Sequence, residues 1–429
     1  MVDHGEGIYL WDTRGRRYID ASSGPIAINI GHGNPRVKEA ACKQLERVAY
    51  ASRFFFENEA NAELASLIAQ QAGAGLERAF FVSGGSEATE TALKLARQHA
   101  VLRGQDSRWK VISRNPSYHG ATLGAASISG DFKSAALFGP MMRGMPKVDA
   151  PFSYRVPEGH TADSFALHCA GELERIIEQE GPNTVLAFIM EPVGGLATGA
   201  LVSTQAYCQR VREICTKHGV LLIHDEVMSG VGRAGAFLAS QHFTRVRPDI
   251  VTMAKGLASG YTPLGAVLAS REMVDDLASA GGFMHGYTYA ANPLSCAIGV
   301  AAVRETLERD MAGNAMRMGE RLRSRLHEVQ KRRRVLGDIR GKGLLMAIEI
   351  VSDPEKKTTF PSSANAISRI VSLAMERGLL LYSRRTADGI FGEWLMVAPP
   401  LIVSPDQVDE IATLIDDALA AFEAQVELG

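Results

Sequence analysis

Two stretches decide the fold of this chain: "GVLLIHDEVMSG" at residues 219–230 and "DIVTMAKGLASGYTPLGAV" at residues 249–267. In the first, an apolar run leads to Asp225, which is typical of a buried strand with a carboxylate at its C-terminal end. In the second, another apolar run leads in the same way to Lys255. Because the carboxyl ends of parallel strands meet at one edge of a sheet, we expect this acid and this amine at the same rim.

Pyridoxal phosphate requires such a pair of side chains. A lysine forms a Schiff base with the aldehyde of the cofactor, and an acid keeps the pyridine nitrogen protonated so that the ring accepts electrons. The alternative interpretation is a solvated lysine after one strand and an acidic helix cap after the other. The remaining motifs of the chain decide between the two.

The composition is that of a large globular protein without a nucleic-acid partner. The 429 residues exceed one ordinary domain, and a hydrophobic content of 46% supports a large core. The 46 Lys and Arg residues against 48 Asp and Glu residues give a net charge of -2, which argues against a polyanion-binding protein. With no apolar stretch long enough to cross a bilayer and no signal peptide at the start, we expect no membrane partner.

The cysteines indicate the compartment. All five are scattered, with neither paired nor metal-ligand spacing, so we expect no metal centre. An odd, scattered set of thiols is typical of a reducing environment, and we expect a cytoplasmic protein.

The order of sequence patterns predicts an α/β fold with two domains. Alternating apolar and polar residues around a turn at 13–15 predict an N-terminal hairpin. From about Phe54, helical and strand patterns alternate, which is typical of a mainly parallel sheet covered by helices on both faces. We expect a large domain at residues 54–291. The end segments, residues 1–53 and 292–429, are expected to form a smaller α+β domain.

Individual elements follow from the same patterns. In the large domain we expect strands at 79–82, 110–113, 185–190 and 220–224, helices at 86–102 and 204–218, and a long irregular excursion from about 130 to 158. Beyond 292 we expect one long helix, a later helix, strands near 379–382 and 395–398, and a final helix from 405.

Three further motifs place polar or aromatic residues at the ends of expected strands. Residues 83–86, Ser-Gly-Gly-Ser, join a strand to a helix. Small residues and the helix dipole favour an anion there, although a glycine turn with Ser86 as N-cap explains the motif equally well. Tyr118 is placed either to stack on a flat heterocycle or to be an ordinary rim aromatic. Glu191 adds a second carboxylate at the same rim.

Six motifs, in this order and spacing, resemble the class III aminotransferases, the ω-amino acid and amine transaminases of pyridoxal-phosphate fold type I. They are "SGGSEATETALKLAR", "SYHGATLG", "EPVGG", "HDEVMSGVGRAG", "AKGLASGYTPLGAV" and "GYTYAANPLSCA". The resemblance runs from about Gly5 to about Pro405. It implies a fold type I enzyme that uses pyridoxal phosphate.

The resemblance also implies how the cofactor is held. Gly85 and Ser86 would bind the phosphate with backbone amides and a hydroxyl. Tyr118 and Val227 would cover opposite faces of the ring, and His119 would stand beside Tyr118.

The remaining implied roles concern catalysis and assembly. Lys255 would carry the cofactor and then move a proton, while Asp225 would pair with the pyridine nitrogen. Glu191 would lie near the oxygen edge of the ring. Thr288 matches a threonine that reaches the phosphate of the neighbouring subunit, so the resemblance implies a homodimer with shared active sites.

Departures from the family pattern concern the substrate side. Members that use 2-oxoglutarate carry a glutamate and an arginine at the positions of Leu196 and Met396, and both are apolar here. This favours pyruvate-type members, which bind the acceptor carboxylate with a mobile arginine. Arg384 and Arg385 are candidates for that role, with solvated loop arginines as the alternative.

Two aromatic side chains complete the expected substrate side. Phe55 and Phe56 align with the aromatic segment that lines the substrate side of the pocket. Relatives usually have some tens of residues before the N-terminal hairpin, some of which line that pocket, so the identity of the amino donor stays open.

We therefore expect an aminotransferase that moves an amino group from an amine or ω-amino acid to a small keto acid, with pyruvate favoured, by a ping-pong mechanism through pyridoxamine phosphate. A 2-oxoglutarate-dependent ω-amino acid aminotransferase is the alternative, as is a racemase, aminomutase or decarboxylating transaminase on the same fold. A non-catalytic binding protein is disfavoured, because such proteins usually lose the lysine or the acid.

Overall fold

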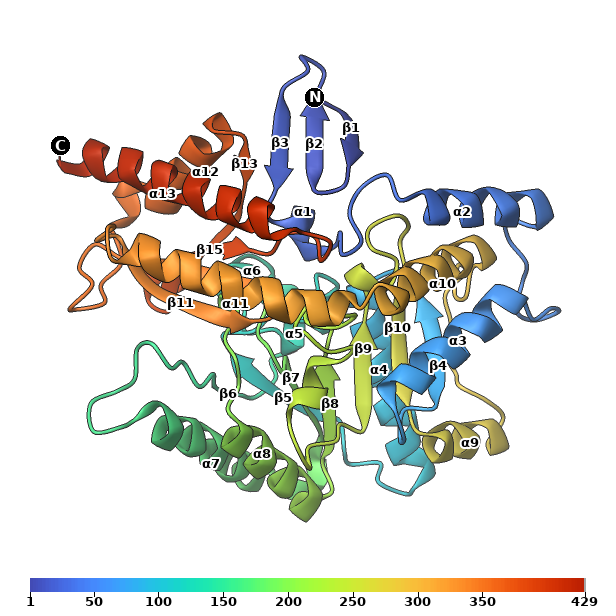
Figure 1. Cartoon of the computed structure of the whole chain (residues 1–429). Helices are drawn as coiled ribbons and strands as arrows, with labels where there is room; N and C mark the ends of the chain where they lie inside the picture. Colours follow the sequence, from blue (N-terminus) through green and yellow to red (C-terminus); the bar gives the residue numbers. More distant parts are fainter. Residues whose placement is uncertain (428–429) are drawn as a thin grey trace.

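The computed structural model describes residues 1–427 and contains three β-sheets (Figure 1). The central sheet has seven strands in the order β4-β10-β9-β8-β7-β5-β6. Strand β10 runs antiparallel to both of its neighbours, and the other neighbours pair in parallel. The strands are β4 (Arg78–Val82), β10 (Gly265–Ala269), β9 (Ile250–Met253), β8 (Leu221–Asp225), β7 (Val185–Met190), β5 (Lys110–Asn115) and β6 (Lys147–Asp149). The expected α/β class with a mainly parallel sheet is confirmed.

Helices cover both faces of this sheet because its central strands are apolar on both sides. Every residue of β7 is buried. Phe188 and Met190 join an apolar cluster with α7 (Ala162–Glu180) and α8 (Gln205–His218). On the opposite side, Ala187 and Ile189 pack in a cluster with α4 (Gly85–Leu102).

A second sheet, antiparallel, has the order β11-β12-β15-β14 and is built from the C-terminal part of the chain. Its strands are β11 (Leu336–Lys342), β12 (Leu345–Ile350), β15 (Gly392–Val397) and β14 (Tyr382–Thr386). The helices α11 (Met311–Gln330) and α12 (Ala366–Glu376) pack against it, and α13 (Pro405–Glu427) packs against these two helices. Figure 1 shows α11 and α13 running side by side.

The third sheet joins the two ends of the chain. Strands β1 (Val2–Glu6), β2 (Tyr9–Asp12) and β3 (Arg17–Asp20) are antiparallel, and β13 (Leu379–Leu380) adds in parallel to β3. The N-terminal hairpin therefore pairs with a strand from the C-terminal segment. The other helices are α1 (Ser23–Ile26), α2 (Pro35–Arg47), α3 (Glu59–Ala72), α5 (Leu123–Ile128), α6 (Phe132–Phe138), α9 (Arg271–Ser279) and α10 (Pro293–Glu308).

Three expectations about individual elements were wrong. The segment from 130 to 158 is not wholly irregular, because it contains α6, a 3₁₀ turn at 139–141 and the edge strand β6. The long helix after 292 is two helices, α10 and α11, which are separated at Asp310, where the backbone is left-handed with φ of 46°. The strand expected near 379–382 is divided between two sheets, as β13 and β14.

Strand β10 had no counterpart among the sequence-based expectations. Within residues 1–427, no helix combines the length and the apolar content that a bilayer crossing requires. The domain limits at residues 53 and 291 remain a prediction.

Candidate active site

A cavity of about 640 Å³ lies at the carboxyl edge of the central sheet. Residues that follow β4, β5, β7, β8 and β9 line it, and β14 of the second sheet contributes Tyr382 and Arg384. This edge is where open α/β sheets bind ligands. The parallel strands thus bring together side chains that are far apart in the sequence.

Asp225 is the last residue of β8 and is buried at the cavity. Its Oδ2 lies 2.8 Å from His119 Nδ1, and its Oδ1 accepts a hydrogen bond of 3.0 Å from the backbone N–H of Val227. His119 is itself fixed, since its backbone carbonyl accepts from Thr89 Oγ1 and its N–H donates to Ser129 Oγ. The carboxylate is therefore held in one orientation.

Lys255 lies two residues after the end of β9 and opens a 3₁₀ turn, Lys255–Leu257. Its φ of 47° is left-handed, a conformation that costs a residue with a side chain about 1–3 kcal/mol. Burial lowers the pKa of Lys255 to about 8, against the opposing influence of Asp225 and Glu191. A buried amine with a lowered pKa supplies a neutral nucleophile near neutral pH.

Glu191 follows β7 and is a second buried carboxyl group at the cavity. Burial raises the pKa of Glu191, and the charges of His119 and Arg114 oppose this shift. Its Oε1 accepts from the N–H of Gly195 at 3.1 Å. Arg114, also buried, lies 3.8 Å from Oε2 and donates to the backbone carbonyl of Glu191 at 2.5 Å.

The N-terminus of α4 forms a cradle for an anion. Gly84 is the N-cap of the helix and Gly85 its first residue, and a Cβ at Gly85 would lie 2.8 Å from Val227 Cγ1, so only glycine fits there. Ser86 Oγ accepts from the N–H of Ala121 at 2.9 Å, which ties this turn to the segment after β5. Backbone N–H groups and the helix dipole favour a phosphate at such a position.

These groups fit pyridoxal phosphate, the cofactor expected from the sequence. The anion cradle, the acid at the end of β8 and the amine after β9 line one cavity. In the described chain, His119 Nε2 and Glu191 Oε2 are buried and lack hydrogen-bond partners. Both residues line the cavity, where polar atoms of a bound ring system would meet them.

One wall of the cavity carries an ion pair. Arg384 Nη2 lies 2.7 Å from Asp131 Oδ2, and both side chains are largely buried. Arg384 Nε is buried without a hydrogen-bond partner among the described residues. Burial raises the pKa of the neighbouring Tyr118, and Asp131 and Tyr382 add to the shift, so its hydroxyl stays protonated. Arg384 thus places a guanidinium, held by Asp131, in the wall of the cavity.

Of the other predicted substrate residues, only Leu196 is on the cavity wall. Arg385 points to the opposite side of β14, where Nη1 pairs with Glu393 at 2.8 Å. Met396 is fully buried on β15 and packs in an apolar cluster against which Leu196 also lies. The expectation that Arg385 and Met396 face the substrate is therefore not met by this chain's own cavity.

The aromatic segment and Thr288 also lie away from this cavity. Phe55 is 81% and Phe56 65% exposed. Thr288 is exposed too, and its backbone carbonyl accepts from Tyr50 Oη at 3.1 Å. Their predicted roles remain predictions, because those roles concern a neighbouring subunit or a pocket that this chain does not form alone.

Sequence reasoning missed Asp131, Tyr382 and Arg114. Asp131 is the N-cap of α6 and accepts from the N–H groups of Lys133 and Ser134, so the spacing of "DFKS" was a usable signal. Tyr382 and Arg384 alternate on one strand, and this period of two was also available. Arg114 offered no such signal, because a lone arginine in a buried strand has no periodic partner.

Comparisons with known proteins place this geometry in a family. A family model described as Aminotransferase class-III matches residues 1–419. An uncharacterized aminotransferase, YodT, of Bacillus subtilis (strain 168) is 36% identical over 100% of this chain and 96% of its own length. An omega-aminotransferase of Caulobacter vibrioides is 33% identical over 99% of this chain and 94% of its own length.

Solved structures agree. A thermostable (S)-enantioselective omega-transaminase from Thermomicrobium roseum is 38% identical, with a TM-score of 0.92 over 98% of this chain and 92% of that one. The omega transaminase from Pseudomonas jessenii in complex with PMP is 31% identical, with a TM-score of 0.93 over 100% of this chain and 94% of that one. The expected fold is that of these transaminases.

Proposed function

The chain belongs to the class III aminotransferase family, and from that premise we propose that it transfers an amino group from an amine or ω-amino acid to pyruvate or a similarly small keto acid. The two substrates would use the cavity in turn, as two half-reactions. Arg384 carries this proposal, because its side chain lines the cavity, as does the apolar Leu196, and its guanidinium is held there by Asp131.

Class III aminotransferases are pyridoxal-phosphate enzymes, and the bound cofactor supplies an electron sink for proton transfer at the carbon that bears the amine. Lys255 Nζ, with its lowered pKa, is the group that would take up and return that proton. Asp225, held by His119 and Val227, would present its negative charge in a fixed direction. The cradle at residues 84–86 would bind the phosphate.

The acceptor proposal follows from the shape and polarity of the cavity. A small keto acid needs one carboxylate contact, which Arg384 would supply while Asp131 holds the guanidinium from its other side. The second carboxylate of 2-oxoglutarate would lie toward apolar side chains that include Leu196, Val193 and Met228. An unpaired carboxylate in apolar surroundings costs a few kcal/mol, so the shorter acid is favoured.

We further propose a homodimer in which Thr288 reaches the phosphate of the partner subunit. Large apolar side chains are exposed near this loop and on the segment that precedes α3, namely Phe54, Phe55, Phe56, Met284 and Tyr289. Exposed apolar groups in such number support a protein interface. Thr288 does not line the cavity of its own chain, which agrees with a role in a neighbouring one.

The experiment that tests the function is a panel of amines crossed with pyruvate, 2-oxoglutarate and glyoxylate, with both products measured. We expect paired formation of a carbonyl product and an amino acid, fastest with pyruvate. A product formed from the donor without any keto acid, over many turnovers, would contradict amino transfer and point to racemase, aminomutase or decarboxylase chemistry.

A further inference from the structure

We infer that the second sheet sets the size of the substrate that the cavity accepts, by holding the loop that carries Leu196. Arg340 on β11, Thr386 on β14 and Trp394 on β15, here called the loop clamp, are assigned as positioning residues for this cavity wall. The inference rests on the proposed function, in that the wall beside Leu196 is taken as the substrate side of the cavity.

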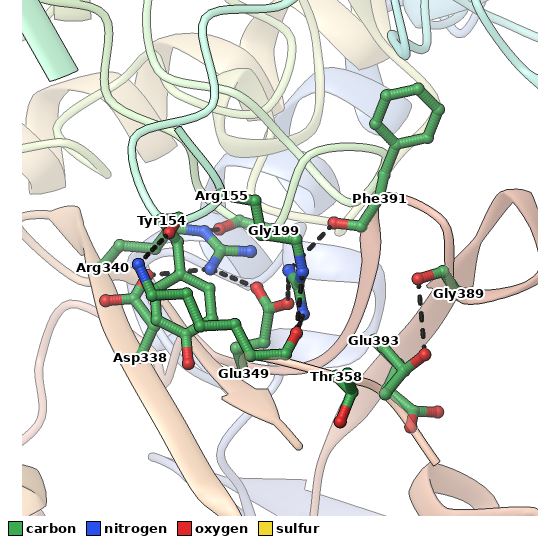
Figure 2. Close-up of polar contacts among 12 residues, drawn as sticks. Tyr154, Arg155, Gly199, Asp338, Arg340, Glu349, Thr358, Gly389, Phe391 and Glu393 are labelled. Carbon is green, nitrogen blue, oxygen red and sulfur yellow. Dashed lines mark hydrogen bonds and ion pairs between the residues drawn. The ribbon is translucent and has the colours of Figure 1, made fainter. Parts of the chain in front are cut away.

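The loop clamp binds four consecutive backbone carbonyls. Trp394 Nε1 donates to the carbonyl of Leu196 at 2.9 Å, and Thr386 Oγ1 donates to that of Ala197 at 3.1 Å. Arg340 binds the next two, with Nη2 at 3.4 Å from the Thr198 carbonyl and Nε at 2.6 Å from the Gly199 carbonyl, the latter contact drawn in Figure 2. A side chain from each of three strands thus fixes the 196–199 loop.

Packing leaves the 196–199 loop no room to move toward the second sheet. Gly199 has φ of 58°, and a Cβ there would lie 2.6 Å from both Arg340 Nη2 and Trp394 Cδ2. Trp394 is fully buried, and its ring lies 5.2 Å from the guanidinium carbon of Arg340. The indole and the guanidinium therefore form a rigid surface behind the loop.

Arg340 is in turn fixed by carboxylates, as Figure 2 shows. Its Nη1 pairs with Glu349 at 2.5 Å and with Asp338 at 3.0 Å. Burial lowers the pKa of Arg340, but the carboxylates of Glu349 and Asp338 raise it by more, so the pKa lies above its ordinary value. Arg155 pairs with the other oxygen of Glu349, so both carboxylate oxygens of Glu349 have a guanidinium partner. A guanidinium with so many fixed partners is well suited to positioning a loop.

The 196–199 loop couples this cluster to the chemistry. The side chain of Leu196 lines the cavity while its backbone carbonyl is bound by Trp394. At the start of the same turn, Gly195 N–H donates to Glu191 Oε1. Removing clamp bonds would release the wall beside Leu196 and enlarge the cavity there, with Lys255 and Asp225 left in place.

The test compares a small and a bulky amine in the donor half-reaction. Thr386→Val deletes one donor to the loop at nearly constant shape, Trp394→Phe deletes another together with one ring of the buried indole, and their double variant deletes both donors. Holoenzyme is mixed rapidly with isopropylamine or α-methylbenzylamine, without keto acid, and the change in visible cofactor absorbance gives a second-order rate constant for each. In the double variant we expect the rate constant for α-methylbenzylamine, divided by that for isopropylamine, to rise by about fivefold or more. Each lost hydrogen bond should change this ratio by a factor of several.

Matched controls separate positioning from general destabilisation. Thr306→Val removes another buried hydroxyl, which binds the Ala302 carbonyl within α10, and should leave the ratio unchanged. Arg155→Lys perturbs the same charge cluster without a contact to the 196–199 loop, whereas Arg340→Lys loses loop contacts and should raise the ratio. The starting absorbance of bound cofactor should be the same in all folded variants.

An unchanged ratio in the double variant, or an equal rise in Thr306→Val, would overturn the inference. The proposed function fails separately, if pyruvate added after either amine does not restore the original absorbance of the wild-type enzyme.

Discussion

His119 Nδ1 lies 2.8 Å from Asp225 Oδ2, and both side chains are buried at the carboxyl edge of the central sheet. The remaining carboxylate oxygen accepts the N–H of Val227 at 3.0 Å. This pairing gives the acid its direction, because a carboxylate with both oxygens engaged cannot rotate freely. A fixed negative charge is the arrangement that stabilises positive charge on a bound heterocycle.

Asp225→Asn should therefore slow amino transfer with little loss of bound cofactor. The neutral amide removes a charge-assisted hydrogen bond worth roughly 1.5–3 kcal/mol, so the half-reaction should slow by about tenfold or more. Rapid-mixing absorbance with isopropylamine measures this. Glu226→Gln is the matched control, since Glu226 is an equally buried neighbour that binds Ser229, Ala239 and Ser240 instead of lining the cavity. If Asp225→Asn reacted with isopropylamine at the wild-type rate, the acid that holds the cofactor ring would have to be another residue.

The lowered pKa of Lys255 predicts how cofactor uptake depends on pH. Only the neutral amine attacks an aldehyde, and with a pKa of about 8 roughly half of Lys255 is neutral at pH 8. The rate of covalent cofactor capture by the cofactor-free protein should thus rise with pH up to about 8 and level off above it. Borohydride trapping followed by mass measurement of the modified chain gives the rate. A rise that continues past pH 10 would show that burial does not lower this pKa.

The central strands and the cavity edge were predictable from the sequence for a simple reason. Buried parallel strands are short apolar runs, and Asp225, Glu191 and Lys255 stand where such runs end. Local pattern therefore located the groups that the structure brings together. Strand β10 was not predicted from the sequence. Its run "GAVLA" follows the lysine motif closely, and no local pattern indicates that the chain turns back there to form an antiparallel strand.

The cavity wall around Arg384 and Leu196 was harder to predict, since its contacts are long-range. Asp131 pairs with Arg384 from a distant part of the chain, and the loop clamp joins residues near 197 to three strands beyond 336. Arg384 and Arg385 show what the sequence pattern could not decide. Two adjacent arginines on a strand face opposite sides of the sheet, and the sequence does not indicate which of them faces the cavity. The sequence supplied both candidates, and only the register of β14 separates them.

Arg384→Gln should weaken the acceptor more than the donor. Loss of a charged partner for a carboxylate costs about 1.5–3 kcal/mol, so KM for pyruvate should rise by about tenfold or more while KM for isopropylamine changes little. Steady-state kinetics with each substrate varied in turn measures both constants. Arg385→Gln is the matched comparison on the same strand, with Arg385 paired to Glu393 away from the cavity. Equal effects of the two variants would contradict the assignment.

Thr288→Ala should weaken phosphate retention at both sites of the proposed homodimer. In a heterodimer of a Thr288→Ala chain and a Lys255→Ala chain, threonine supplied across the interface would place both lesions in one site. The other site would then be intact and turn over like wild type. Separated heterodimers are measured for cofactor content and amino transfer, and complete absence of a wild-type-like site would refute the cross-subunit role.

One two-step measurement tests amino transfer to a small keto acid. Holoenzyme incubated with isopropylamine alone should release about one acetone per active site and then stop, because the amino group remains on the enzyme. Pyruvate added next should yield an equal amount of alanine and restore the starting absorbance, at a kcat/KM on the order of a hundredfold above that for 2-oxoglutarate. Continuous product formation without keto acid would contradict amino transfer, and restoration by 2-oxoglutarate in preference to pyruvate would contradict a small keto acid as the acceptor.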